Sequence, residues 1–220
     1  MRSWTRPDGR CFVLGDVDAA LPDGELYATV DERDAARRRR LEEMGFAVDR
    51  RELRLVLPTD PASTGLTDVA LPDGYAVVRA DAVAERPLRL LDDALRQDVP
   101  GTDGWRWSPE GFREETYASA AFDPAVYLVA LTRAAREGAG IGRVWLTPSG
   151  PRLGLIGVLP RHRRRGLARA LLAHVFAVLD RRGFAEVATE VDETNIASRA
   201  LLEPLGARVV GATLELRRAL

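Results

Sequence analysis

Residues 158–171 read Val-Leu-Pro-Arg-His-Arg-Arg-Arg-Gly-Leu-Ala-Arg-Ala-Leu, and an apolar stretch, 153–158, leads into them. After the arginine-rich turn, apolar residues return at helical spacing, with small residues at Gly166 and Ala168. A helix N-terminus has unpaired backbone N–H groups and a positive dipole end, and small residues let an anion approach the main chain. A strand, a basic glycine turn and a helix in this order predict a pyrophosphate-binding site.

The composition is that of a globular protein with one domain or slightly more. Hydrophobic residues make up 46% of the 220 residues, and the formal net charge is −1. All 32 cationic side chains are arginines, which indicates a GC-rich genome and fits a bacterial source. The near-neutral charge argues against a nucleic-acid partner.

Cysteine and histidine are too scarce to suggest a disulfide or a metal centre. Cys11 is the only cysteine, and the chain has two histidines. Residues 1–10 lack the apolar stretch of a secretory signal, and no run of about 18 apolar residues predicts a membrane span. We therefore expect a cytoplasmic protein without a membrane partner. A homodimer is one of the oligomeric states left open.

An internal repeat relates residues 25–55 to residues 186–216 without a gap. The identical residues of the first copy are Glu25, Val30, Asp31, Glu32, Ala36, Arg38, Leu41, Glu42, Gly45, Val48, Leu53 and Leu55. Each copy is predicted to form a strand, a helix and a second strand, with a glycine, Gly45 or Gly206, after the helix.

The rest of the chain predicts a mixed sheet flanked by helices, an α/β (α+β) fold. Strands are predicted at 75–79, 125–132, 140–147, 152–158, 184–191 and 207–217, and helices at about 82–97, 109–120, 165–182 and 195–204. We predict three parts: a half-domain at 1–57, a linker at 58–74 and a main domain at 75–220.

This element order and the basic turn resemble the GCN5-related N-acetyltransferase (GNAT) family over residues 75–217. The family's acetyl-CoA signature, Arg/Gln-x-x-Gly-x-Gly/Ala, is met by Arg163, Gly166 and Ala168. A Val-x-Pro precedes it at 158–160, and the later Val-x-x-x-Asn and Leu-Gly of the family occur at 191–195 and 205–206.

The resemblance implies an acyl-CoA N-acyltransferase fold that binds acetyl-CoA. Backbone N–H groups of the turn should hold the pyrophosphate, and the pantetheine arm should lie in a wedge where strands 152–158 and 184–191 separate. The residues implied in binding are Val158, Arg163, Arg164, Arg165, Gly166, Leu167, Ala168, Arg169, Asn195 and Ser198.

The resemblance also implies which residues act as acid and base in the reaction. Glu190 is implied as the general base, acting directly or through water, and Glu186 is a competitor on the same face of the strand. The family's usual acid is a tyrosine at a position that is Leu202 here. Three interpretations stay open: Tyr127 or Tyr117 donates the proton, the thiolate leaves unassisted, or the enzyme is impaired.

Two tryptophans lie in the stretch that, by the resemblance, forms a wall of the acceptor site. Trp105 and Trp107, with Phe112 after them, either form an aromatic cage for an amine or anchor a loop by their own burial.

Residues 25–55 resemble the last third of the same fold without its cofactor turn. Thr29 stands where Glu190 stands, and Asp34 stands where Asn195 stands. We expect a degenerate half-domain that binds no cofactor. Because it cannot bury its sheet face alone, it should pack on the main domain.

The sequence therefore predicts an acetyl-CoA-dependent N-acetyltransferase without a metal. The acceptor is expected to be a primary amine of a small molecule or peptide, acylated by direct transfer. The alternative is a catalytically impaired acyl-CoA-binding or regulatory module.

Overall fold

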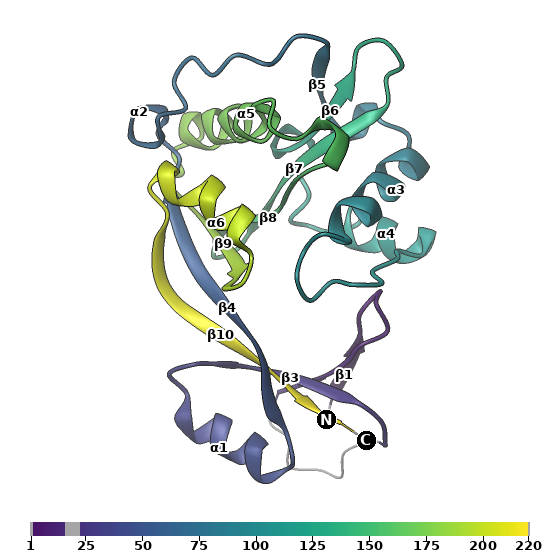
Figure 1. Cartoon of the computed structure of the whole chain (residues 1–220), viewed down its shortest axis with the longest axis vertical. Helices are drawn as coiled ribbons and strands as arrows, with labels where there is room; N and C mark the ends of the chain where they lie inside the picture. The colour runs from purple at the N-terminus through teal and green to yellow at the C-terminus, as the bar shows by residue number, and fades with distance from the viewer. Residues whose placement is uncertain (1, 16–22, 220) are drawn as a thin grey trace.

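Ten strands form one continuous sheet in residues 2–15 and 23–219, which are the residues that this computed structural model describes (Figure 1). The strands are β1 (Arg2–Thr5), β2 (Cys11–Leu14), β3 (Leu26–Asp31), β4 (Ala47–Pro58), β5 (Tyr75–Arg79), β6 (Tyr127–Thr132), β7 (Gly138–Thr147), β8 (Gly150–Val158), β9 (Glu186–Asp192) and β10 (Arg208–Arg218). Their order across the sheet is β1-β2-β3-β10-β4-β9-β8-β7-β6-β5.

The helices cover the sheet on both faces. They are α1 (Ala35–Glu43), α2 (Pro61–Thr64), α3 (Glu85–Arg96), α4 (Pro109–Glu115), α5 (Leu167–Arg181) and α6 (Ile196–Leu202). In the described part of the chain, none of them is long and apolar enough to cross a membrane. The mixed sheet flanked by helices confirms the predicted fold class.

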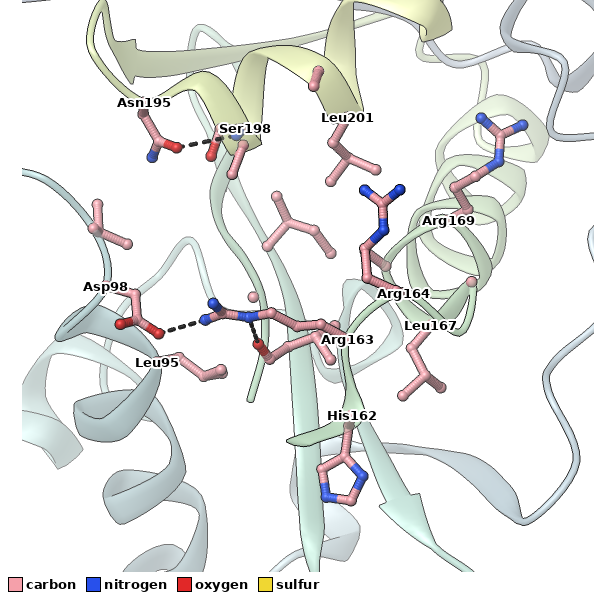
Figure 2. A pocket seen from close by; sticks show the side chains of 18 residues that line it. Leu95, Asp98, His162, Arg163, Arg164, Leu167, Arg169, Asn195, Ser198 and Leu201 are labelled. Atoms are coloured by element: carbon pink, nitrogen blue, oxygen red, sulfur yellow. Dashed lines mark hydrogen bonds and ion pairs between the residues drawn. The ribbon is translucent and has the colours of Figure 1, made fainter. Parts of the chain in front are cut away.

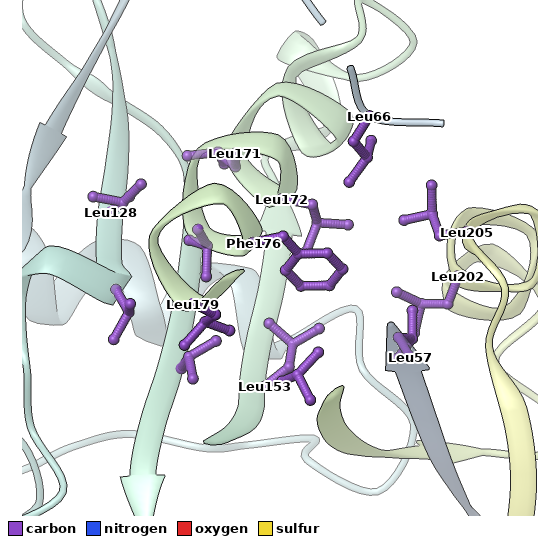
Figure 3. Close-up of a cluster of buried hydrophobic side chains, with 14 of the residues drawn as sticks. Leu57, Leu66, Leu128, Leu153, Leu171, Leu172, Phe176, Leu179, Leu202 and Leu205 are labelled. Atoms are coloured by element: carbon purple, nitrogen blue, oxygen red, sulfur yellow. The ribbon is translucent and has the colours of Figure 1, made fainter. Parts of the chain in front are cut away.

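Alternation along β6 separates the two largest apolar cores. Leu128 and Ala130 face the core that includes α5 and α6, whereas Tyr127, Val129 and Leu131 face the core that includes α3 and α4. Figure 3 shows the first core, in which side chains of α5 meet side chains of β8 and β4. The sheet between the cores is buried on both faces here.

The last strands of the two repeat copies are exchanged. Strand β4, from the first copy, pairs with β9, and its Leu53, Leu55 and Leu57 belong to the core around α5. Strand β10, from the second copy, pairs with β3, and its Leu214 and Leu216 join α1 in a third core. Each unit therefore takes a strand from the other to complete its core.

The pairing register repeats with the sequence. Glu52 pairs with Asp192 on β9, and the residue equivalent to Glu52, Thr213, pairs with Asp31 on β3. Glu52 and Thr213 pair with each other in the middle of the β4–β10 ladder. The two copies are thus related by a local twofold relation centred on this pair.

The repeat extends further in the structure than in the sequence. Strands β1 and β2 pair antiparallel, and β2 pairs parallel with β3, as β7, β8 and β9 do in the main unit. Residues 15–25 join β2 to β3, whereas residues 159–185, which include the basic turn and α5, join β8 to β9. The N-terminal unit therefore keeps the hairpin and has a much shorter connection.

Most elements lie where the sequence predicts them, and β5 has the predicted bounds. Strands β1 and β2 have four residues each and no clear alternation, and they were not predicted. The segment predicted as a linker, 58–74, contains α2, and its Leu66 is buried beside α5. Asp60 caps α2 and Pro61 occupies its first turn, which explains a helix in so polar a stretch. The division of the chain at 57 and 75 stays a prediction.

Candidate active site

Strands β8 and β9 separate after only two paired positions. Arg152 pairs with Ala188 and Leu153 with Thr189, and the Thr189 hydroxyl donates to the Leu153 carbonyl at 2.9 Å. Strand β8 continues from there to Val158 without a pairing partner on that side in the described chain. The predicted wedge is present, and its apex lies at Leu153 and Thr189.

The turn after β8 has an unusual backbone. Arg164 has a φ of 60° and Gly166 a φ of 83°, both in the left-handed region. A non-glycine residue in this region costs on the order of 1 kcal/mol, and such strain is often found at binding sites. Gly166 is the N-cap of α5 and carries no side-chain cap.

This backbone leaves a run of amides free. Among the described residues, no backbone carbonyl accepts from the N–H groups of residues 164–169, and the first such bond, from Ala170 N–H to the Gly166 carbonyl, is 3.0 Å long. Free N–H groups at the positive end of a long helix form an anion-binding cradle.

The cradle opens into a pocket of about 550 Å³ (Figure 2). This is the volume range of small-molecule and nucleotide sites. The predicted binding residues that line it are Val158, Arg163, Arg164, Gly166, Leu167, Ala168, Arg169, Asn195 and Ser198. Arg165 does not line it, and its guanidinium donates to the Tyr75 hydroxyl at 3.3 Å instead.

The Arg163 side chain crosses the pocket wall and joins two elements. Its Nε donates to the Val158 carbonyl at 2.8 Å, and its Nη2 forms an ion pair with Asp98, which follows α3 (Figure 2). Sequence reasoning missed Asp98 as a pocket residue. The two partners are 65 positions apart, and no local pattern marks such a pair.

Asn195 has a structural role as well as a place in the pocket. Its side-chain oxygen accepts from the Ser198 backbone N–H at 3.0 Å and caps α6. Asp34 caps α1 in the same way, accepting from the Arg37 N–H at 2.9 Å. Both copies of the repeat therefore have the cap, and Asn195 also lines the pocket.

Glu190 lies at the apex of the wedge. It follows Thr189, the last residue of β9 that pairs with β8, and it forms an ion pair with Arg152 of β8. Val187, Thr189 and Val191 are buried, so the alternation of β9 places Glu190 on the face opposite the α5 core. Its competitor Glu186 lies before the paired residues and binds Arg208 at 2.7 Å, away from the wedge.

The candidate proton donors are less well placed. Tyr127 is completely buried, its hydroxyl has no hydrogen-bond partner among the described residues, and burial raises its pKa. Burial also raises the pKa of Tyr117, which is 36% exposed. Neither tyrosine lines the pocket, and Glu190 does not line it either, although Glu190 is next to the apex of the wedge. Leu202 is buried in the α5 core.

The tryptophans are anchored by groups of the same chain. Trp105 is only 7% exposed, and the Arg96 guanidinium lies 4.4 Å from its ring centroid. The Trp107 indole N–H donates to Asp92 at 2.9 Å. The geometry therefore favours the anchored loop over an open aromatic cage.

Asp92 is the centre of a buried ionic network that sequence reasoning missed. It accepts from Arg96 at 2.6 Å and from Arg143 at 3.0 Å, and both Asp92 and Arg143 are buried. Burial raises the pKa of Asp92, but Arg143 and Arg96 lower it by more, so its pKa lies below the usual value. The network fixes α3 to β7 and to the tryptophan loop.

A protein-family model described as the acetyltransferase (GNAT) family matches residues 90–207. The match includes the wedge, the basic turn and α6. The chain belongs to the GNAT acetyltransferase family.

The chain matches only part of the length of its curated relatives. The chain is 33% identical over 170 residues to a mycothiol acetyltransferase of Salinispora arenicola, covering 71% of this chain and 49% of that protein. It is 47% identical over 51 residues to the [ribosomal protein bS18]-alanine N-acetyltransferase of Escherichia coli, covering 23% of this chain and 34% of that one. The chain thus spans about half of the first relative and a third of the second.

Solved GNAT structures share the fold of nearly the whole chain. A GCN5-related N-acetyltransferase from Sphaerobacter thermophilus has a TM-score of 0.68 at 22% identity, covering 88% of this chain and 59% of that one. A tandem GNAT protein from the clavulanic acid biosynthesis pathway has a TM-score of 0.64 at 21% identity, with coverages of 88% and 63%. These likenesses extend the shared fold beyond the residues that the family model matches.

Proposed function

We propose that the protein is an acetyl-CoA-dependent N-acetyltransferase. The observation that carries the proposal is the run of free backbone amides at 164–169, which opens into a pocket beside the separated ends of β8 and β9. An anion cradle and an open strand edge in one pocket suit a ligand with a pyrophosphate and an extended amide-bearing arm.

The residues present fit such a ligand from one end to the other. The 164–169 amides would hold the pyrophosphate, with the Arg164 and Arg169 side chains at the same rim of the pocket. The pantetheine arm would run along β8 from Val158 toward Leu153, a strand length of about 16 Å at the usual rise per residue. Arg163 would have to release the Val158 carbonyl for the arm to pair there.

The bound acetyl-CoA supplies an activated acyl group as a thioester. Glu190, at the apex of the wedge, would take a proton from the acceptor ammonium directly or through one water, so that the neutral amine can attack the acyl carbon. Arg152, its ion-pair partner, would orient the carboxylate. The new C–N bond forms as the C–S bond breaks, and the proton that the nitrogen loses in becoming an amide passes to the thiolate through water or through a group other than Leu202.

The acceptor is proposed to be a primary amine of a small molecule or a peptide. The name of the Escherichia coli relative gives an alanine of a ribosomal protein as its acceptor, which keeps a peptide amine among the candidates here. The N-terminal unit is proposed to be a degenerate copy that binds no nucleotide, since the connection 15–25 is too short to contain a counterpart of the basic turn and α5.

The second candidate is an acyl-CoA-binding module without turnover. It is favoured by the buried Leu202 at the usual acid position and by the absence of Tyr117 and Tyr127 from the pocket lining. A panel of primary amines, including alanine-initiated peptides, separates the two. Release of CoA thiol from acetyl-CoA that depends on one of the amines supports the enzyme, whereas calorimetric binding of acetyl-CoA with no amine-dependent release supports the module. No binding at millimolar CoA contradicts both.

A further inference from the structure

Three arginines of the N-terminal unit converge on the segment that links α3 to α4, residues 97–108, here called the acceptor loop. Arg6 and Arg10 both donate to the Gly101 carbonyl, the second at 3.1 Å. Arg50, on β4, donates to the Pro100 carbonyl at 2.6 Å. Two neighbouring carbonyls of one loop are thus held by guanidinium groups from another part of the chain.

These arginines are fixed by a buried acid. Glu215 of β10 is 3% exposed and lies 3.6 Å from Arg6, 3.4 Å from Arg10 and 3.3 Å from Arg50. Arg50 is also 3.4 Å from Asp192, at the end of β9. Buried ion pairs with several partners hold side chains in place more firmly than exposed pairs do.

Gly101 leaves room for the Arg50 guanidinium because it has no Cβ. It has a φ of 75°, and a Cβ at this position would overlap the Arg50 guanidinium. Gly104, in the same loop, has a φ of 76° and open space around its Cβ position. The φ values of the two glycines are alike, and only Gly101 has the arginine at its Cβ position.

The acceptor loop also forms a wall of the acyl-CoA pocket. Asp98 and Val99 line the pocket, and Asp98 holds Arg163, whose Nε holds the Val158 carbonyl at 2.8 Å. Contacts therefore run from Arg50 through the loop to Arg163 of the basic turn. Arg163 pairs with Asp98 through Nη2, so this ion pair can remain when Nε releases the Val158 carbonyl to the ligand.

We propose that the N-terminal unit positions the acceptor loop, and through it the rim of the acyl-CoA pocket, with Arg50 as the principal positioning residue. The proposal rests on the proposed function for its ligand, acyl-CoA, and on the contacts above for its mechanism. A loop that is held before the ligand arrives loses less conformational freedom on binding, so clamping it raises affinity. The N-terminal unit, which has the strands of the fold but no counterpart of the basic turn, would then have a positioning role.

The test is a matched pair of substitutions, Gly101→Ala and Gly104→Ala. Both place a side chain at the same positive φ, so they carry the same backbone strain, but only Gly101→Ala displaces Arg50. We expect Gly101→Ala to weaken CoA binding by about fivefold in calorimetry and Gly104→Ala by less than about twofold, because only the first frees the loop. Hydrogen exchange of amides 98–105 should be faster in Gly101→Ala than in Gly104→Ala, with and without CoA.

Removing the arginine tests the mechanism. In an Arg50→Ala background, Gly101→Ala and Gly104→Ala should have the same CoA affinity and the same hydrogen exchange, because the Arg50 guanidinium that only Gly101→Ala displaces is absent. If Arg50→Ala does not fold, the glycine pair in the otherwise unchanged chain still decides the matter. Equal exchange and equal CoA affinity for the two glycine variants would overturn the proposal. If the protein binds no CoA but exchange is still faster in Gly101→Ala, then Arg50 positions the loop and the proposed function is wrong. The experiment therefore tests the positioning role and the proposed function separately.

Discussion

Glu190 differs from the other carboxylates of β9 by its position at the end of the β8–β9 pairing. It is part-exposed and forms an ion pair with Arg152, so its carboxylate is held where an acceptor in the wedge could contact it. Asp192 on the same face is buried, forms an ion pair with Arg50 and accepts a hydrogen bond from the N–H of Thr194. The geometry therefore separates residues that alternation alone treats as equivalent.

Replacing Glu190 by glutamine should reduce turnover without loss of CoA affinity. A general base contributes about 100-fold or more to rate, and the amide cannot accept the proton. Amine-dependent thiol release and calorimetry measure the two effects. Glu186→Gln, which removes a more exposed ion pair at the start of the same strand, is the control and should keep full activity. Full activity of Glu190→Gln would rule out the base role.

The charge of Asp92 should contribute strongly to stability. Asp92→Asn leaves Arg96 and Arg143 buried without their counter-ion and should lower the free energy of unfolding at pH 7 by about 3–5 kcal/mol. Urea unfolding measures this difference. Asp81→Asn, which removes a surface partner of Arg79, is the control and should change little.

The stabilisation by Asp92 should depend on pH in a direction that its lowered pKa determines. Because the pKa of Asp92 is lowered in the folded state, its stabilisation is present above the unfolded value of about 4 and is lost as the pH falls through the lower folded value. The difference between the wild type and Asp92→Asn should therefore shrink below pH 4. A difference that stays constant from pH 7 to pH 3 would show that the charge is not the cause.

At the scale of elements, α5 is a helix whose two ends are built differently. Its first turn has free amides and faces the pocket, whereas its last carbonyls accept from the N–H groups of Arg182 and Gly183. Gly166 and Gly183 flank the helix with φ values of 83° and 80° and have no close contact at the Cβ position. The two glycines are therefore matched in strain and differ in what they face.

Gly166→Glu should abolish the thermal protection that CoA gives, and Gly183→Glu should keep it. Both substitutions cost backbone strain of about 1–2 kcal/mol, but only the first places a carboxylate among the amides that would hold a pyrophosphate. The shift in melting temperature with millimolar CoA is the measurement, with each variant compared to its own ligand-free state. Unchanged protection in Gly166→Glu would refute the phosphate role of the turn.

For the whole molecule, the exchanged strands make the two units depend on each other. The N-terminal core contains Leu214 and Leu216 from β10, and the main core contains Leu53, Leu55 and Leu57 from β4. Neither core is complete when the strand from the other copy is missing. We therefore expect the chain to unfold in one cooperative step.

Leu41→Ala tests this cooperativity from the N-terminal unit. Leu41 of α1 is 2% exposed, and its truncation should cost about 3 kcal/mol. Both the tryptophan fluorescence, which comes mainly from the main unit, and the far-ultraviolet circular dichroism should shift to the same lower midpoint. Arg39→Ala, on the exposed side of α1, is the control and should leave the midpoint unchanged. A main-unit transition that keeps its original midpoint would show that the units unfold separately.

The sequence by itself determined the features that depend on neighbours along the chain. The basic turn, the helix after it, the helix that starts near Asn195 and the bounds of most strands follow from residue spacing within a few positions, and the structure contains them. The internal repeat is also visible in the sequence, because identical residues recur at a fixed offset.

Only the tertiary structure decided which strands are neighbours and which charges meet. The alternation in β4 and β10 shows that each strand has an apolar face, but not whose core that face completes, because every strand of this kind offers the same backbone donors and acceptors. Arg163 with Asp98, and Arg50 with Pro100, are pairs 65 and 50 residues apart. In a chain with 32 arginines, the charge pattern cannot single out these partners, and the folded sheet brings them together.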